Sequence, residues 1–482
     1  MKLRELLTGV PICAGSADLE MEISGVSYDS RTTQPGDLFV AMTGFATDGH
    51  QYIAKALANG AAAVLCQQRP AEACAYVQTE NSRRALAVIG GNWFGHPAEK
   101  MTMIAVTGTC GKTTTTYLLK AILEQARGVK VGLIGTNQNM IGSDVIPTER
   151  TTPESFEVQK LFREMADAGC THVVMETSSH ALYLDRVYGV RYDVGIFTNL
   201  TQDHLDFHKT MENYCDAKAI LFRNCVTGVV NADDPWTPRL LKDADCKVMT
   251  YAEQADADLR AENIVLSAGG IAFDAVSGAE RAPIRVNIPG GFMVYNTLDV
   301  LGAALALGIS LEESAAVLAK VPHVKGRVEI VPTPGRDYTI LIDYAHTPDS
   351  MVNVLQTVKQ FAKGRTVAVF GCGGDRDRTK RPLMGKAAAD WSDFAVVTTD
   401  NPRTEEPEAI IEDILPGFDG SATPYQVVVD RIEAIHWAMD HAEKDDVIVL
   451  CGKGHETYQE VNHVKHHMDE REIVADYLSS GR

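Results

Sequence analysis

Short apolar segments recur along this chain, and each is followed by a Gly-rich or polar loop. Apolar strands that alternate with helical patterns predict mainly parallel sheets covered on both faces. In open sheets of this kind ligands bind beyond the carboxyl ends of the strands. We therefore expect an α/β protein whose chemistry lies in the loops that end "MIAVTG", "KVGLIGT", "THVVMET", "VGIFTNL" and "GVVNADD", and, later in the chain, "YTILIDYAH", "RTVAVFGCGG", "DFAVVTTDNPR" and "DVIVLCGKGHE".

Two changes of pattern divide the 482 residues into three parts. Residues 1–97 combine short strands and turns with an Ala-rich helical stretch, after which "GNWFGHPAEKM" interrupts the pattern with Gly and Pro. The first set of strand–helix repeats follows, together with a more strand-rich stretch, and a second set opens near residue 327. Because one hydrophobic core rarely serves so long a chain, we expect three domains, at 1–97, 98–326 and 327–482.

Composition excludes several classes of protein. The net charge is −19 and no Lys/Arg cluster forms a basic face, so the chain is not a general nucleic-acid binder. It has no apolar run long enough to span a membrane and no secretory signal pattern at its start. Its 10 cysteines are scattered without CxxC pairs, as in reduced compartments. We therefore expect a cytoplasmic protein.

The segment "AVTGTCGKTTTTYLLKA", residues 105–121, resembles a phosphate-binding loop with unusual spacing. The common form has four residues between its first glycine and Gly-Lys-Ser/Thr, whereas Gly108 lies two residues closer to Gly111 than that. Glycines let backbone N–H groups and a helix N-terminus approach an anion. The alternative is a turn that binds nothing, but four threonines follow the lysine. We predict that ATP phosphates contact Gly108, Thr109, Cys110, Gly111, Lys112, Thr113 and Thr114, with the Thr113 hydroxyl on magnesium.

Two further polar positions are ambiguous from the residues alone. Glu176 ends an apolar strand, where it could bind magnesium or cap the next helix. Lys218 lies mid-helix among apolar residues, a position usually occupied by a surface lysine with a buried stem. If Lys218 is buried, its amine pKa falls, and the neutral amine could react with carbon dioxide. The resulting carbamate would be an anion suited to a second magnesium ion.

Several motifs occur together and in a fixed order: "TGTCGKTT", "METSSHAL", "TNLTQDHLDFH" with "AKAILF", "MVYNTLDVLGAA", "HVKGRVE", "IDYAHTPDS" and "GCGGDRDRTKRP". This set resembles the Mur ligase family, ATP-dependent enzymes that join amino acids to the peptidoglycan precursor. The resemblance covers essentially the whole chain, and "GTxGKTT" is this family's form of the phosphate loop. It implies a small N-terminal UDP-substrate domain, a central ATPase domain with a mainly parallel sheet, and a C-terminal Rossmann-like domain that brings the amino acid.

The resemblance also implies residue roles. Lys112, Glu176, His204 and Lys218 match catalytic positions, and two magnesium ions are implied at Thr113, Glu176, His204 and carbamylated Lys218. Further ATP contacts match Asn296, Arg327, Asp343 and His346, with Tyr344 in the same segment, and contacts to the UDP-sugar peptide match Ser30, Thr151, Thr152, Ser178 and Arg186. Two departures are visible: Leu184 replaces a usual glutamine, and Met293 replaces the first asparagine of the family's "FNxYN" segment.

The stretch "TTDNPRTEEP", residues 398–407, resembles the family's signature for meso-2,6-diaminopimelate. Without that context, a surface turn with a solvated arginine would be the better interpretation. An arginine suits two-point recognition of a carboxylate, and Glu456 could hold the ammonium group. The implied contacts to this amino acid are Arg376, Asp400, Asn401, Pro402, Arg403, Gly452 and Glu456.

The expected reaction activates a carboxylate. ATP phosphorylates the D-glutamyl γ-carboxylate of UDP-N-acetylmuramoyl-L-alanyl-D-glutamate, and the diaminopimelate amine attacks the acyl phosphate. Two alternatives remain: a ligase of the same superfamily that adds L-lysine or extends folate with glutamate, and a nucleotide-dependent binding module without ligase chemistry. The "DNPR" motif and the N-terminal domain disfavour the first, and Lys218 with an amino-acid pocket disfavours the second. We expect the enzyme to act as a monomer.

Overall fold

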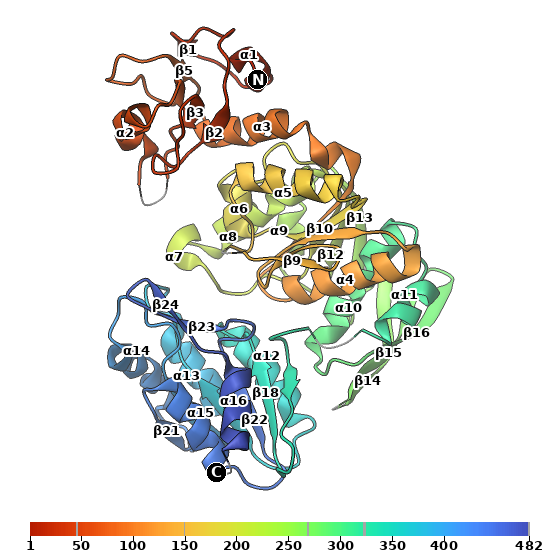
Figure 1. The fold of residues 1–482 in the computed structure, drawn as a ribbon. Helices are drawn as coiled ribbons and strands as arrows, with labels where there is room; N and C mark the ends of the chain where they lie inside the picture. The colour runs from red at the N-terminus through yellow and green to blue at the C-terminus, as the bar shows by residue number, and fades with distance from the viewer. Residues whose placement is uncertain (45–46, 149, 268, 322–323, 481–482) are drawn as a thin grey trace.

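The computed structural model describes residues 1–482 except 45–46, 149, 268, 322–323 and 481–482. Figure 1 shows three units stacked in chain order, coloured red, then orange to green, then cyan to blue. Within the described residues each unit has its own main sheet, of five, eleven and six strands respectively. None of the described helices is long and apolar enough to cross a membrane. The first residue of "HVKGRVE", His323, lies outside the described residues.

The N-terminal unit is a small sheet covered by short helices. Its strands, in spatial order, are β1 (Ala14–Gly15), β5 (Tyr76–Gln78), β4 (Ala63–Cys66), β3 (Asp37–Val40) and β2 (Gly25–Ser27). All neighbours are parallel except β1 and β5. The helices are α1 (Leu3–Leu6), α2 (Ile53–Ala58) and α3 (Ser82–Phe94). The amide oxygen of Asn81 caps α3 by accepting from two backbone N–H groups, so this helix begins at a defined point.

The central unit has a parallel sheet extended by antiparallel strands at both edges. Its parallel strands, in spatial order, are β14 (Leu259–Ser267), β13 (Lys247–Ala252), β12 (Cys225–Asn231), β11 (Tyr192–Phe197), β6 (Thr102–Thr107), β10 (His172–Glu176) and β7 (Val131–Ile134). The antiparallel edges are β15 (Gly270–Ser277) with β16 (Glu280–Val286), and β8 (Asn139–Ile141) with β9 (Asp144–Ile146). The strand-rich stretch expected near 247–290 is therefore one edge of this sheet.

Helices cover both faces of the central sheet. One face packs against α4 (Lys112–Arg127), α10 (Phe292–Ala306) and α11 (Leu311–Leu318). The other face packs against α5 (Ser155–Asp167), α6 (Ser179–Tyr183) and α8 (Met211–Ala219). Strands buried on both faces have continuous apolar sequences, which explains why "MIAVTG" and "THVVMET" carry no polar alternation. The predicted doubly covered parallel sheet is confirmed.

The C-terminal unit repeats this arrangement. Its strands, in spatial order, are β17 (Glu329–Val331), β18 (Thr339–Asp343), β22 (Val447–Cys451), β19 (Thr366–Phe370), β20 (Phe394–Val397) and β21 (Tyr425–Val427). All neighbours are parallel except β17 and β18. One face packs against α12 (Pro348–Lys359), α13 (Lys380–Trp391) and α14 (Pro407–Ile414), the other against α15 (Arg431–Asp440) and α16 (Glu470–Ser479). A separate hairpin, β23 (Tyr458–Val461) and β24 (Val464–His467), follows β22.

A buried acid joins α10 to α4 directly behind the phosphate loop. Asp299 is 0% exposed, and the Thr115 hydroxyl oxygen lies 3.1 and 3.0 Å from its two carboxylate oxygens. One hydroxyl donates only one proton, and Asp299 has no ion-pair partner among the residues that the structure describes. Burial raises the pKa of Asp299 well above its usual range. Burial therefore favours the neutral, protonated form of Asp299 in the folded protein.

This neutral acid predicts a pH-dependent stability. The folded state keeps the proton above about pH 4, where the unfolded chain loses it. Stability from Asp299 is therefore fully present below about pH 4 and is lost as pH rises towards the folded-state pKa, by about 1.4 kcal/mol per pH unit. Asp299→Asn keeps the shape of the side chain but removes the titratable group. The melting temperature of this variant should therefore rise relative to that of wild type as pH increases from about 5 to 8.

The matched control is Asp256→Asn, because the Asp256 side chain is 99% exposed. Its melting curve should follow wild type at every pH. Parallel pH profiles for wild type and Asp299→Asn would contradict a neutral Asp299.

Candidate active site

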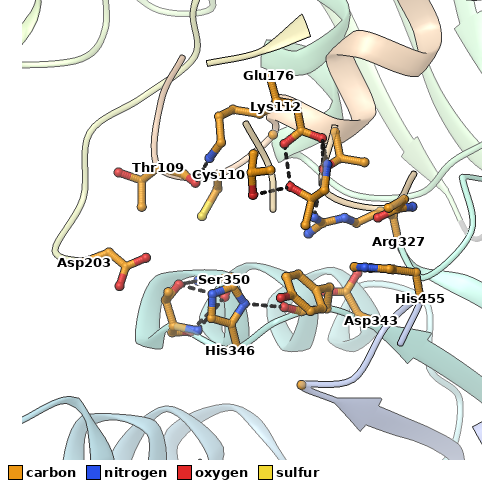
Figure 2. A pocket seen from close by; sticks show the side chains of 18 of the residues that line it. Thr109, Cys110, Lys112, Glu176, Asp203, Arg327, Asp343, His346, Ser350 and His455 are labelled. Atoms are coloured by element: carbon orange, nitrogen blue, oxygen red, sulfur yellow. Dashed lines mark hydrogen bonds between the residues drawn. The ribbon is translucent and has the colours of Figure 1, made fainter. Parts of the chain in front are cut away.

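A cavity of about 1280 Å³ lies between the carboxyl ends of the central and C-terminal sheets. Figure 2 shows the two sides facing each other, with Cys110, Lys112 and Glu176 on one side and Asp343, His346 and Ser350 on the other. The lining includes nearly all of the predicted site residues, namely Thr109, Cys110, Gly111, Lys112, Thr113, Thr114, Thr151, Thr152, Glu176, Ser178, Arg186, His204, Asn296, Arg327, Asp343, Tyr344, His346, Arg376, Asp400, Asn401, Arg403, Gly452 and Glu456. The tertiary structure thus brings loops from two separate sheets to one site.

The phosphate loop follows β6 and has no room for larger residues at its glycines. A Cβ on Gly108 would lie 1.8 Å from the Thr198 hydroxyl, and one on Gly111 would lie 2.4 Å from the Asn296 amide oxygen. Both glycines have positive φ angles, 152° and 89°. The loop is also held from the side, because the Cys110 N–H donates to the Asn199 side chain at 2.9 Å. Packing, glycine and this side-chain contact therefore hold the loop backbone.

Lys112 begins α4, and its ammonium lies over the loop. Nζ donates to the carbonyls of Gly108 and Thr109 at 2.9 and 2.8 Å. Burial lowers the pKa of Lys112. A bound anion would stabilise the charged form of this buried amine, and a phosphate in the loop is such an anion.

The carboxylate of Glu176 is a hub between three loops. It is 1% exposed and accepts from the Thr113 hydroxyl at 2.9 Å and from both the backbone N–H and the hydroxyl of Thr136 at 2.9 Å. The helix that follows it, α6, is capped instead by Ser178, whose hydroxyl accepts from the N–H of Ala181. The capping interpretation of Glu176 is therefore wrong.

Arg327 reaches this hub from the far side of the cavity. Its guanidinium donates to the Thr113 hydroxyl at 3.1 Å and lies 5.0 Å from the ring centroid of Tyr344. Figure 2 shows Arg327 between Glu176 and the Asp343 segment. The start of the C-terminal unit is thereby tied to the phosphate loop.

Lys218 is buried, so its interpretation as a surface residue is wrong. It is 1% exposed, donates from Nζ to the Gly108 carbonyl at 2.8 Å, and lies 4.3 Å from the ring centroid of Tyr214. Burial, and next the nearby Lys112 charge, hold the pKa of Lys218 well below its usual range. An uncharged amine is the form that reacts with carbon dioxide.

The remaining predicted metal position is His204. This residue lies in a left-handed turn, at φ +54°, and its Nε2 is 3.4 Å from the Asp203 carboxylate. Among the described residues, no group of three or more His, Cys, Asp or Glu side chains is placed to hold a metal ion. The Glu176 carboxylate beside the Thr113 hydroxyl does fit magnesium, which prefers oxygen ligands and keeps several waters or phosphate oxygens.

The segment between β9 and α5 and the loops on either side of α6 form the predicted peptide side of the cavity. The hydroxyls of Thr151 and Thr136 lie 2.9 Å apart, and the Thr152 hydroxyl donates to the Glu176 carbonyl at 2.8 Å. Arg186 donates to the Thr152 carbonyl at 3.1 Å and lies 3.6 Å from the Glu154 carboxylate. These contacts join the peptide side directly to the Glu176 hub.

Four predicted positions and one departure lie apart from or beside this lining. Gly108 and Lys218, which share the hydrogen bond from Nζ to the carbonyl, are outside the described lining. Ser30 is in the N-terminal unit, where its carbonyl accepts from the Asn59 side chain, and the described lining does not include it. Pro402 is likewise outside the described lining. Leu184 ends α6 through a backbone bond to His180.

The predicted nucleotide contacts lie where α10 and the Asp343 segment meet the phosphate loop. Asn296 packs on Gly111, and its amide donates to the Met293 sulfur at 3.7 Å, so the second departure directly contacts the retained asparagine. Asp343 accepts from the Val328 N–H at 2.8 Å, and burial raises its pKa. Burial lowers the pKa of His346 to about 4, so this ring is neutral at pH 7.

The predicted amino-acid side lies at the ends of β19, β20 and β22. Arg403 has a φ of +53°, donates to the Gly374 carbonyl at 2.8 Å, and lies 3.2 Å from the Glu460 carboxylate. Arg376 and Arg403 both line the cavity, and burial, followed by the charge of Arg403, lowers the pKa of Arg376. Two clustered cations are suited to an anionic group such as a carboxylate.

Three residues of this side were not predicted from the sequence. Lys453 is fully buried beside Asn401, His455 lines the cavity near Tyr344, and Glu460 holds Arg403. Lys453 and His455 belong to "CGKGHETYQ", which follows a strand whose end was predicted to carry chemistry. Their position in that loop was the one sequence feature that could have identified them. Their roles depend on contacts between loops far apart in sequence.

Comparison with known proteins gives a consistent result. The sequence matches the models of three protein-family domains: the Mur ligase family catalytic domain over residues 22–93, the Mur ligase middle domain over 106–304, and the Mur ligase glutamate ligase domain over 326–454. It is 48% identical over 463 residues to UDP-N-acetylmuramoyl-L-alanyl-D-glutamate--2,6-diaminopimelate ligase of Clostridium botulinum, covering 95% of each chain. It is 47% identical to UDP-N-acetylmuramoyl-L-alanyl-D-glutamate--2,6-diaminopimelate ligase 1 of Clostridium acetobutylicum, covering 99% of each chain.

Solved structures are also similar to this chain. A structure of a UDP-N-acetylmuramoyl-L-alanyl-D-glutamate--2,6-diaminopimelate ligase is 32% identical, has a TM-score of 0.70, and covers 100% of this chain and 99% of its own. The Mycobacterium tuberculosis folylpolyglutamate synthase complexed with ADP and AMPPCP is 20% identical, has a TM-score of 0.65, and covers 77% of this chain and 92% of its own. The second similarity concerns the fold alone.

Proposed function

The chain belongs to the Mur ligase family, whose members are ATP-dependent ligases, and we propose that it joins meso-2,6-diaminopimelate to UDP-N-acetylmuramoyl-L-alanyl-D-glutamate. The observation that carries the proposal is the shared cavity, in which the phosphate loop faces the Arg403 loop. The names of the relatives support the same substrates. The proposed domains are 1–97 for the UDP-substrate, 98–326 for ATP and 327–482 for the amino acid.

The proposed reaction has two steps. In the first, the γ-phosphoryl group of ATP is transferred to an oxygen of the D-glutamyl γ-carboxylate, which releases ADP and forms an acyl phosphate. In the second, the neutral diaminopimelate amine attacks the acyl carbon, and the tetrahedral intermediate collapses with loss of phosphate and of the amine proton. No side chain becomes covalently bound, so the protein acts by positioning and by electrostatics.

On the ATP side, Lys112 and the loop N–H groups would bind the phosphates, and Arg327 would add a second cation from the other unit. Magnesium would be held by Glu176, Thr113, His204 and the carbamate of Lys218. When bound, two magnesium ions would supply positive charge that neutralises phosphate oxygens. On the peptide side, Arg186 and Thr152 would orient the D-glutamyl residue next to the Glu176 hub.

The direct test of the proposal is an amino-acid screen read by phosphate release from ATP. The wild-type protein should release phosphate only when the UDP-linked dipeptide and an accepted amino acid are both present. Diaminopimelate should be preferred to L-lysine and L-glutamate. Phosphate release without either co-substrate would favour a nucleotide-dependent module instead.

Lys112→Ala should leave a folded protein with at least about 100-fold lower kcat, the usual result of losing one group that stabilises developing charge. The loop backbone is held by Gly108, Gly111 and Asn199, so circular dichroism and melting should change little. Lys160→Ala is the control, because the Lys160 side chain is 60% exposed. Near-normal turnover of Lys112→Ala would reject the phosphate-loop assignment.

We predict that Lys218 carries a carbamate. Protein equilibrated with ¹³C-bicarbonate should show a carbamate ¹³C signal that disappears in Lys218→Ala. The variant should be inactive, and a small carboxylate such as acetate should restore part of the activity by filling the vacated anion position.

Lys120→Ala is the matched control for this label. Lys120 is also buried, but its side chain pairs with the Glu124 carboxylate at 2.7 Å. Its removal should leave the carbamate signal intact. A signal that survives in Lys218→Ala, or a variant with full activity and no added carboxylate, would contradict the prediction.

Arg403→Ala should change the choice of amino acid. Diaminopimelate differs from lysine by one carboxylate at the far end of its side chain, and loss of a buried partner for such a charge costs about 2–5 kcal/mol. We expect kcat/KM for diaminopimelate to fall by roughly 30-fold or more, and discrimination against lysine to fall with it.

Arg403→Lys separates charge from geometry, since lysine keeps the charge but lacks the two-point fork. Arg378→Ala is the control, because the Arg378 side chain is 67% exposed. If Arg403→Ala leaves the ratio of the two amino acids unchanged, the specificity assignment is wrong even where the ligase activity persists.

A further inference from the structure

A completely buried lysine lies beneath the amino-acid side of the cavity. Lys453 is 0% exposed, and its Nζ donates to Glu456 Oε2 at 2.6 Å and to Asn401 Oδ1 at 2.8 Å. The ammonium also lies 5.1 Å from the ring centroid of Tyr458. The described lining of the cavity does not include Lys453, so this cation acts through the residues that it holds.

Lys453 determines which way the Asn401 amide faces. An ammonium group only donates hydrogen bonds, so Asn401 must turn its oxygen towards Lys453. That oxygen also accepts from the Glu460 N–H at 2.9 Å. The Asn401 amide nitrogen is then left to donate to Glu456 Oε2 at 3.0 Å. The three side chains form a closed set of contacts with one allowed orientation of the amide.

The same contacts leave one oxygen of Glu456 available. Oε2 accepts from both Lys453 and Asn401. Oε1 has no hydrogen-bond partner in the part of the chain that the structure describes, and Glu456 lines the cavity. A carboxylate with one oxygen held and the other open to the cavity is suited to an ammonium group of a ligand.

The contacts also join two loops that follow strands which are not neighbours in the sheet. Lys453 and Glu456 follow β22, whereas Asn401 and Arg403 follow β20, and β19 lies between these strands. Arg403 is held from the same side, because its backbone N–H donates to the Glu460 carbonyl at 3.1 Å and its guanidinium pairs with the Glu460 carboxylate. The position of Glu456 relative to Arg403 therefore depends on the Lys453 contacts.

From this geometry we propose that Lys453 is a positioning residue that sets specificity for an amino acid whose far end carries both an ammonium and a carboxylate group. The inference rests on the proposed function, in which Arg403 receives the carboxylate and Glu456 the ammonium. Lys453 holds the Asn401 loop against the Glu456 loop at the spacing that such a zwitterionic end requires. It also orients the Glu456 carboxylate so that Oε1 faces the ligand.

The experiment compares Lys453→Met, Glu456→Gln and the double variant. For Lys453→Met we expect the KM for diaminopimelate to rise about 30-fold, as for a lost buried charge contact. The KM values for ATP and for the UDP-linked dipeptide should stay near wild type, and kcat should change by only a few fold. In the Glu456→Gln background, Lys453→Met should add little, because residues that act through one contact are not additive.

Lys386→Met is the matched control. Lys386 also pairs with a carboxylate, that of Asp390 at 2.9 Å, but its side chain is 65% exposed and lies outside the described lining of the cavity. The same chemical change there should leave all three KM values unaltered. If Lys453→Met does not fold, Lys453→Gln keeps a donor without the charge, and the same selective rise in the diaminopimelate KM is expected at a smaller factor.

Two outcomes would overturn the inference. One is a folded Lys453 variant whose diaminopimelate KM equals that of wild type. The other is a rise shared by all three substrates, or effects of Lys453→Met and Glu456→Gln that multiply, either of which indicates a merely structural ion pair. Failure of the proposed function is distinguishable, since wild type would then release no phosphate with diaminopimelate.

Discussion

The hydroxyl of Thr113 is the point on which the rest of the site depends. It donates to Glu176 and accepts from Arg327, so one side chain of the phosphate loop joins the end of β10 to the start of the C-terminal unit. Glu176 in turn is held by Thr136, which follows β7. A buried carboxylate is stable only when hydrogen bonds satisfy it, and here those bonds come from the loops that must bind the substrates. The hydrogen bonds that satisfy Glu176 therefore also hold these loops in the arrangement of the site.

The buried lysines of the site divide into two kinds. Lys112 and Lys218 both contact loop carbonyls, and burial lowers the pKa of each. The surroundings of Lys112 favour the binding of an anion. The surroundings of Lys218 favour its uncharged amine. Lys453 instead donates to a carboxylate and an amide within the protein. The lysines on the ATP side are thus placed to meet the charge of a ligand. On the amino-acid side, the charge of Lys453 is already paired with Glu456, and this lysine holds other protein groups in position.

The departures from the family pattern have different structural consequences. Met293 contacts the retained Asn296 on the same turn of α10, and Asn296 packs directly on Gly111. Asp299, one turn further along α10, contacts Thr115 of α4. The nucleotide side of α10 is therefore held against α4 by the contact of Asp299 with Thr115 and by close packing on Gly111. Leu184 lies at the end of α6, two residues before Arg186, which lines the cavity.

Sequence by itself determined the parallel sheets, the phosphate loop and the strand ends that carry the chemistry, because apolar runs, glycines and their spacing are local properties. It could not decide whether Lys218 is buried or whether Glu176 caps a helix. Those answers depend on Gly108, Thr113 and Thr136, which are distant in sequence from Lys218 or Glu176 and are brought to them by the fold. The roles of Asp299 and Lys453 were not visible at all, since each needs a partner on a distant element. Burial and partner choice are set by long-range packing, and only the tertiary structure specifies them.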